Sequence, residues 1–136
     1  MAGYILVVDD EPDVRELFKI TLNMAGYRTA VASDGLQALD EIAKESPELI
    51  VLDLMMPHLD GFGVLDRLRE EREEHANGPL KVLVATAKTL DDGDKEHLNS
   101  WPVVGVLNKG ELDLSKMVHD VKSLLSDKPA KQAKQT

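Results

Sequence analysis

The feature that most constrains this chain is a regular alternation of short aliphatic runs with stretches of helical periodicity. Four runs are largely β-branched and aliphatic and lack polar alternation, which is the pattern of parallel strands covered on both faces. They are Tyr4–Val8, Leu49–Leu52, Lys81–Ala85 and Val103–Leu107. A weaker fifth run, Tyr27–Ala32, lies between the first two. The sequence therefore predicts five strands, four of them fully buried.

Apolar residues recur at helical spacing after each of these runs. Stripes lie within residues 14–25, 38–43, 62–68 and 114–125, and Gly26 is a natural stop for the first. The segment Asp91–Asn99 is mostly charged, with Leu98 as its main apolar anchor. This order favours an α/β fold with a doubly wound, five-stranded parallel sheet in the flavodoxin-like order 2-1-3-4-5 and helices on both faces.

Length and composition bound the remaining possibilities. The 136 residues suit one domain, which we expect over residues 1–126, followed by a polar, disordered tail at 127–136. A net charge of −9 and 4% aromatic residues argue against direct nucleic-acid binding. The chain has no cysteine, which excludes a disulfide scaffold and a thiol nucleophile. No apolar run approaches the roughly 18 residues of a membrane span, so we expect a cytoplasmic protein with no membrane partner.

Polar residues gather where the predicted strands end. Asp9, Asp10 and Glu11 follow the first run, Asp53 follows the run Leu49–Leu52, Thr86 follows the next, and Lys109 comes after the last. Ligands of an open parallel sheet bind beyond the carboxyl ends of its strands. In the order 2-1-3-4-5 these four strands are neighbours, so their end residues should converge on one rim.

Each of these residues also has an ordinary interpretation. Asp10 could cap the helix that begins at Pro12, and Lys109 could be a solvated surface lysine. The joint pattern is harder to explain in this way, because two carboxylates about 4 Å apart repel by roughly 4 kcal/mol at a surface-like dielectric. A lysine and a hard divalent cation would offset that repulsion. Oxygen ligands suit Mg²⁺, with Mn²⁺ as an alternative.

A carboxylate, a magnesium site, a lysine and a hydroxyl together suit phosphoryl transfer onto an aspartate. The carboxylate is ionised at neutral pH and needs no base before it attacks phosphorus. The two cations offset charge on the phosphoryl oxygens, and the hydroxyl donates to one of them.

The residues that would do this also carry a resemblance to a known family. The segment DLMMPHLDG at residues 53–61, with Asp9–Asp10, Thr86–Ala87 and Lys109, resembles the receiver domain of two-component response regulators, over residues 4 to about 126. The resemblance implies that Asp53 is the phosphoacceptor, that Asp9, Asp10, Asp53 and the backbone carbonyl of Met55 ligate the metal, and that Thr86 and Lys109 bind the phosphoryl oxygens. It also implies that Pro57 and Gly61 shape the loop after Asp53.

The resemblance further implies how the protein takes part in signalling. The phosphoryl donor is expected to be a histidine kinase or a histidine phosphotransfer protein that approaches the rim and the first helix. Output is expected through protein contacts or onward transfer. Such a receiver catalyses its own phosphorylation and dephosphorylation and is not a conventional turnover enzyme. The oligomeric state stays open.

Two positions depart from the family pattern. Val106 stands where the family usually has an aromatic residue that responds to the threonine, so the usual coupling cannot operate. Gly110 stands where the family usually has a proline after a cis peptide bond, and we predict a trans Lys109–Gly110 bond. Lys-Gly at this place resembles receivers of hybrid sensor kinases and favours a relay role. Lys88 lies where the family tunes access of water to the phosphoaspartate.

Two other classes of protein remain as alternatives. One is a receiver-fold interaction module that is not phosphorylated, or a receiver cut from a larger hybrid kinase or regulator. The other is a magnesium-dependent hydrolase with Asp53 as nucleophile, which would need an acid at position 55, where this chain has Met55. The four histidines have no metal-like spacing and are predicted to be surface residues.

Overall fold

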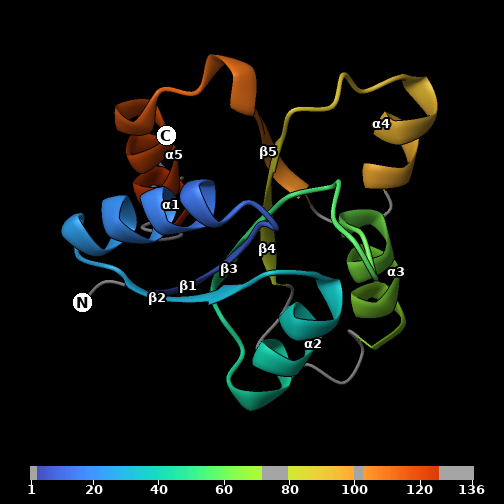
Figure 1. Ribbon diagram of the computed structural model, residues 1–136, viewed down its shortest axis with the longest axis horizontal. Helices are drawn as coiled ribbons and strands as arrows, with labels where there is room; N and C mark the ends of the chain where they lie inside the picture. The colour runs from blue at the N-terminus through green and yellow to red at the C-terminus, as the bar shows by residue number, and fades with distance from the viewer. Residues whose placement is uncertain (1–2, 72–79, 100–102, 126–136) are drawn as a thin grey trace, which may run out of the picture.

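The computed structural model describes residues 3–71, 80–99 and 103–125, so the predicted tail at 127–136 lies outside the described residues. The described part is a parallel sheet between two layers of helices (Figure 1). In chain order the elements are β1 (Tyr4–Val8), α1 (Pro12–Met24), β2 (Arg28–Ala32), α2 (Gly35–Lys44), β3 (Leu49–Leu52), α3 (Gly61–Glu71), β4 (Lys81–Thr86), α4 (Asp92–Leu98), β5 (Val103–Asn108), the 3₁₀ turn η2 (Lys109–Glu111) and α5 (Leu114–Leu125). The strand order β2-β1-β3-β4-β5, parallel throughout, confirms the predicted fold.

The core has two halves because successive strand residues point to opposite faces of the sheet. On one face Ile5 and Val7 of β1 pack against Phe18 of α1 and Met117 of α5. On the other face the alternate residues of the strands pack against α2, α3 and α4. Figure 1 shows the same division, with α1 and α5 together on one side of the sheet. Parallel strands buried from both sides explain the uninterrupted aliphatic runs of β1, β3 and β4.

The prediction of a fully buried last strand is wrong. β5 lies at the edge of the sheet and pairs only with β4, so its residues alternate between half-buried and exposed. Val104 and Val106 are among the exposed large hydrophobic side chains. The run looks like a central strand in sequence because an edge strand of valines and a buried one have the same composition.

Helix ends carry recognisable caps. α1 is followed by Gly26, whose φ of 103° is the left-handed conformation that glycine tolerates best. The Asp34 carboxylate caps α2 by accepting from the Gln37 N–H at 2.9 Å. Asp91 and Asp94 form a reciprocal capping box on α4, which explains how so polar a segment is helical.

In the part of the chain described here, no helix combines the length and the apolar character needed to cross a membrane.

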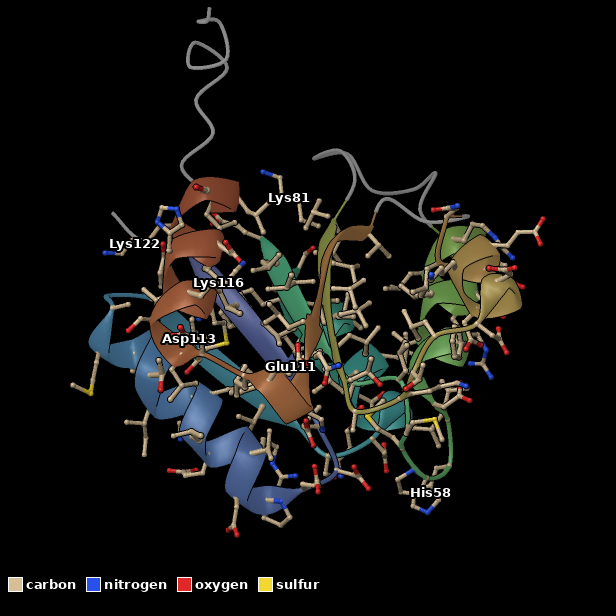
Figure 2. The ribbon with its side chains drawn as sticks, turned by 90° about the horizontal axis from the view of Figure 1, so that it is seen from above. His58, Lys81, Glu111, Asp113, Lys116 and Lys122 are labelled. Carbon is tan, nitrogen blue, oxygen red and sulfur yellow. The ribbon has the colours of Figure 1, made fainter. Side chains whose placement is uncertain are left out.

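The sheet direction defines one functional end of the molecule. Figure 2 shows Lys81, the first residue of β4, at the opposite end from His58, in the loop after β3, and from Glu111, the last residue of η2 after β5. Asp9, Asp10 and Asp53 follow β1 and β3, Thr86 ends β4 and Lys109 follows β5, so these site residues lie at that second end.

Candidate functional site

An acidic cluster lies at the carboxyl ends of β1 and β3. Asp9 follows β1 directly and its N–H donates to the Ala32 carbonyl at 3.1 Å, while the Asp53 N–H donates to the Val8 carbonyl at 3.0 Å. These backbone bonds extend the sheet by one residue and fix where both side chains start. Asp9 and Asp53 are buried, and Asp10 is exposed. One carboxylate oxygen from each of the three lies within 4.8 Å of the others.

Lys109 brings a positive charge into contact with the carboxylates of this cluster. Its Nζ lies 2.8 Å from Asp9 Oδ2 and 3.3 Å from Asp53 Oδ2, and its side chain is only 10% exposed. The same amine also reaches Glu11 Oε1 at 3.1 Å. The strand order therefore brings residues about a hundred positions apart in the sequence into one ion-pair network.

Burial and charge shift two pKa values in this network. Desolvation raises the pKa of Asp53, and the neighbouring Asp9 charge adds to this, although the Met55 N–H and Lys109 act in the opposite direction. For Lys109, burial alone would lower the pKa, but hydrogen bonds to Asp9 and Glu11 and the charges of Asp9 and Asp53 raise it well above its ordinary value. Lys109 is therefore a permanent cation, and the cluster still carries more negative than positive charge.

The donor set fits a hard divalent cation. Its ligands would be carboxylate oxygens, which Mg²⁺ prefers, and two of them are buried next to an exposed third that leaves a side open to solvent. Burial, followed by the charge of Asp9, keeps the pKa of Asp53 raised even though Lys109 lies beside it. A ligand role for the Met55 carbonyl stays a prediction, since the contact seen here is the Met55 N–H donating to Asp53 Oδ1 at 3.2 Å.

The predicted hydroxyl lies at the end of the neighbouring strand. Thr86 is the last residue of β4 rather than the first residue after it, and it is buried in register with Asn108. Its Oγ1 accepts from the Lys88 N–H at 3.0 Å. The Lys88 amine itself pairs with Asp94 of α4 at 3.0 Å, so the predicted water-controlling lysine is attached to α4 in this structure.

The loop after Asp53 is shaped as tightly as its sequence suggests. A Cβ on Gly61 would lie 2.4 Å from the Asp53 carbonyl oxygen and 2.8 Å from Leu54 Cα, so only glycine fits there without backbone movement. His58 has a φ of 68°, which is uncommon for a residue other than glycine. Its Nδ1 lies 2.8 Å from Asp34 Oδ2, and this contact ties the loop to the start of α2.

Both departures from the family pattern are visible in the structure. The Lys109–Gly110 bond is trans, as predicted, because the described residues contain no cis peptide bond. Val106 is 48% exposed on β5, opposite Val84 of β4. That the usual threonine–aromatic coupling is lost stays a prediction.

Sequence reasoning missed several contacts of the site. Glu11 pairs with Lys109, and it is Glu11 rather than Asp10 that occupies the N-cap position of α1. Arg15 donates to the Asp9 carbonyl at 2.7 Å and secures the loop after β1. His97 stacks on Phe62 and contacts Asp66, so it has a structural role between α4 and α3. Only Glu11 gave a signal in the sequence, because it adjoins the two aspartates.

Comparison with known proteins gives a consistent answer. The family model described as "Response regulator receiver domain" matches residues 5–122. A curated relative, "Probable transcriptional regulator ycf27" of Cyanophora paradoxa, is 49% identical over 87 residues, which is 64% of this chain and 35% of the relative. The chain thus matches about a third of the length of such relatives.

Two solved structures resemble the fold over most of the chain. The response regulator TrrA of Thermotoga maritima, in complex with Mg²⁺-BeF, is 31% identical with a TM-score of 0.73 and covers 91% of this chain and 99% of its own. The receiver domain of a signal transduction histidine kinase from Syntrophus aciditrophicus is 27% identical with a TM-score of 0.78 and covers 99% and 95%.

Proposed function

The chain belongs to the response regulator receiver domains of two-component systems, and on that basis we propose that it accepts a phosphoryl group on Asp53. The observation that carries this proposal is the cluster in which the Asp53 carboxylate meets Asp9, Asp10 and the Lys109 amine at the carboxyl end of the sheet. In this proposal, residues 1–126 form the receiver unit, and the protein modifies itself rather than turning over a separate substrate.

The proposed step forms one bond and breaks one. An Asp53 oxygen attacks the phosphorus of a phosphohistidine, an acyl phosphate forms, and the P–N bond breaks with its electron pair remaining on the imidazole nitrogen. Lys109 offsets negative charge on the transferred oxygens, and the Thr86 hydroxyl donates to one of them. Mg²⁺ held by Asp9, Asp10 and Asp53, with the Met55 carbonyl as a further proposed ligand, would supply additional positive charge. TrrA, with Mg²⁺-BeF bound, supports this assignment by analogy.

The partner surface is proposed to include the outer face of α1. Leu17, Ile20 and Met24 lie at helical spacing on α1 and are 43%, 47% and 83% exposed. The same helix begins directly after the acidic cluster, so a protein bound to this stripe could present a phosphohistidine to Asp53. We propose a histidine kinase or histidine phosphotransfer protein as that partner, in the cytoplasm.

Intact mass spectrometry after incubation with MgCl₂ and acetyl phosphate tests the proposal. We expect a gain of one phosphoryl group that is lost in Asp53→Asn and after chelation of the metal. Asp60→Asn is a matched control, because this carboxylate lies in the same loop and accepts from the Gly63 N–H rather than joining the cluster. No mass gain in the wild type, with beryllofluoride also failing to bind, would favour the interaction module instead.

A further inference from the structure

Lys109 reaches the acidic cluster from a short 3₁₀ turn rather than from the strand before it. It is the first residue of the 3₁₀ turn η2, and the peptide bond that follows it is trans. The amine nevertheless lies within 3.3 Å of both Asp9 and Asp53. Some local feature of this turn must therefore set the direction in which Lys109 leaves the backbone.

Asn108 is placed to set that direction. Its Oδ1 accepts from the Gly110 N–H at 2.7 Å and closes a short loop around Lys109. Asparagine is suited to such a turn because its side chain can replace a backbone acceptor two residues before the donor. A Cβ on Gly110 would lie 3.2 Å from this same oxygen, so glycine leaves room for the contact. A proline at position 110 could not make it, because proline has no N–H.

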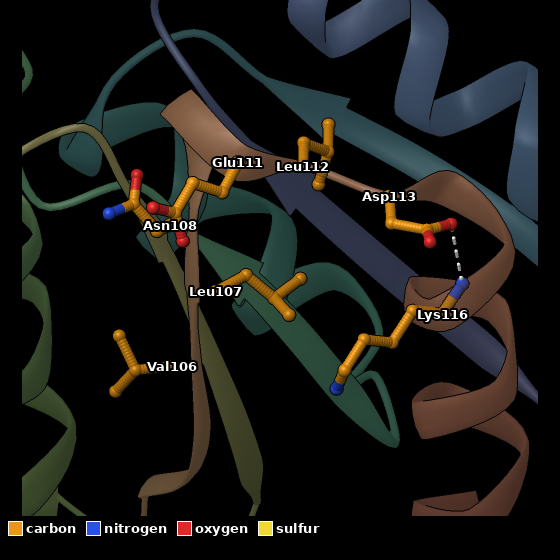
Figure 3. Close-up of a pocket in the computed structure, with 7 residues that line it drawn as sticks. All are labelled: Val106, Leu107, Asn108, Glu111, Leu112, Asp113 and Lys116. Carbon is orange, nitrogen blue, oxygen red and sulfur yellow. Dashed lines mark hydrogen bonds between the residues drawn. The ribbon is translucent and has the colours of Figure 1, made fainter.

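The Asn108 side chain has no comparable role in the core. The residue is exposed, and it is the last residue of β5. The start of α5 is capped separately, since the Lys116 N–H donates to Asp113 Oδ1 at 3.1 Å. Figure 3 shows the two places apart, with Asn108 and Glu111 near the end of β5 and the Asp113–Lys116 hydrogen bond at the first turn of α5.

We propose that Asn108 is a positioning residue for phosphoryl transfer, which acts by holding the turn that aims Lys109 at the acidic cluster. This inference rests on the proposed function of Asp53. In this proposal, the Asn108–Gly110 hydrogen bond holds the trans Lys-Gly turn in the conformation that directs the Lys109 amine toward the cluster.

A double-mutant cycle isolates the contact. Asn108→Ala removes the acceptor, Gly110→Pro removes the donor, and the double variant removes both. Asn108→Asp restores an acceptor at the same place. Asp113→Ala is the matched control, because it removes a side-chain-to-backbone hydrogen bond in the same loop without touching the turn at Lys109. All variants are assayed as the full chain with acetyl phosphate and MgCl₂.

The expected result is a selective kinetic defect. Asn108→Ala should lower the maximal phosphorylation rate by about fivefold, as for the loss of one ordinary hydrogen bond, with the half-saturating Mg²⁺ concentration and the Tm little changed. Asn108→Asp should recover at least half of the rate. In the Gly110→Pro background, Asn108→Ala should cause no further loss. Asp113→Ala should lower the Tm and leave the rate within about twofold.

Three outcomes would overturn the inference. They are a wild-type rate in Asn108→Ala, an equal loss from Asn108→Ala in both the glycine and the Gly110→Pro backgrounds, or a loss matched by an equal fall in Mg²⁺ affinity. Failure of the proposed function is distinguished from these because the wild-type chain itself would then show no phosphorylation at all.

Discussion

The Asp53 carboxylate is both the proposed nucleophile and a buried group whose pKa is raised. Its pKa in the folded protein is raised by desolvation and by the Asp9 charge, so the folded state binds the proton more tightly than the unfolded chain. The corresponding stability is present at low pH and is lost as the pH rises through the raised value. We therefore expect Asp53→Asn to raise the free energy of unfolding of the metal-free protein at pH 7, measured by urea denaturation in EDTA.

The gain in the free energy of unfolding of Asp53→Asn over wild type should shrink as the pH is lowered toward the ordinary pKa of aspartate. In excess MgCl₂ it should also shrink or reverse, because wild type has the extra carboxylate ligand and gains more from a cation that binds only the folded state. Asp60→Asn, which lies outside the cluster, should show neither trend. A destabilised Asp53→Asn in EDTA at pH 7 would contradict the view that burial and the Asp9 charge disfavour the ionised Asp53 carboxylate.

Two glycine substitutions compare the tight packing beside the loop after Asp53 with an open position in α4. Gly61→Ala would place a Cβ against the Asp53 carbonyl and Leu54 Cα, and we expect it to lower the free energy of unfolding by about 1–3 kcal/mol. Gly93→Ala in α4 would meet only Asp91 Oδ1 at 3.4 Å, and alanine favours a helix, so a gain of up to about 1 kcal/mol is expected. Urea denaturation of both variants measures these changes. Equal changes in the free energy of unfolding would contradict the difference in packing between the two positions.

The positions of the main site residues could be predicted from the sequence, but their contacts could not. Asp9, Asp53 and Thr86 were found because the ends of parallel strands meet at one edge, which is a property of topology alone. Glu11 and Asn108 depend on side-chain directions around the trans turn at Lys109, which no spacing rule encodes. Their roles become visible only once the distances are known.

At the scale of elements, prediction succeeded where burial is uniform. β1 and β3 have the predicted bounds because both are covered on two faces and their aliphatic runs are unbroken. The burial of β5 could not be predicted, because its edge position follows from the strand order and not from its own residues. α4 has little apolar periodicity, and its stability comes from the reciprocal contacts of its cap.

The start of α2 offers an element-level test with a pH dependence. The pKa of Asp34 is lowered, chiefly by the Gln37 N–H and then by His58. The stability contributed by the charge is therefore present above the ordinary pKa of aspartate and is lost as the pH falls through the lowered value. Asp34→Ala should cost about 1 kcal/mol at pH 7 through loss of the cap, and Asp34→Asn should cost less.

Thermal unfolding of the two Asp34 variants between pH 7 and strongly acidic pH checks this reasoning. The gap between wild type and Asp34→Asn should close toward acidic pH, because both side chains are then neutral. The gap between Asp34→Asn and Asp34→Ala should remain, because it reflects the cap and not the charge. If the first gap instead widened on acidification, the Asp34 carboxylate could not be stabilised in its ionised form.

At the scale of the whole molecule, the strand order decides what lies next to the site. β1 is an interior strand next to β3, and the loop after it, which carries Asp9 and Asp10, leads directly into α1 and its exposed stripe. A small phosphoryl donor needs only the rim, whereas a protein donor also needs a surface to bind. The stripe should therefore matter for one kind of donor and not for the other.

Substitution of the stripe separates these two requirements. Ile20→Glu should slow phosphotransfer from a phosphorylated histidine phosphotransfer domain by at least about fivefold, because a charge would enter the apolar part of the interface. The donor is chosen by its ability to label the wild-type chain. The rate with acetyl phosphate should be unchanged. Leu36→Glu is the matched control, since Leu36 is similarly exposed, at 49%, but lies on α2 in the opposite layer.

The deciding quantity is the ratio of the rate with the protein donor to the rate with acetyl phosphate, measured for the same variant. If Ile20→Glu lowered both rates equally, the substitution would have disturbed the acidic cluster rather than a docking surface. If Leu36→Glu were as damaging as Ile20→Glu with the protein donor, the partner would approach across the rim toward α2 as well. A loss confined to the protein donor and to α1 is the only pattern that places the phosphohistidine partner on the helix that begins beside Asp10.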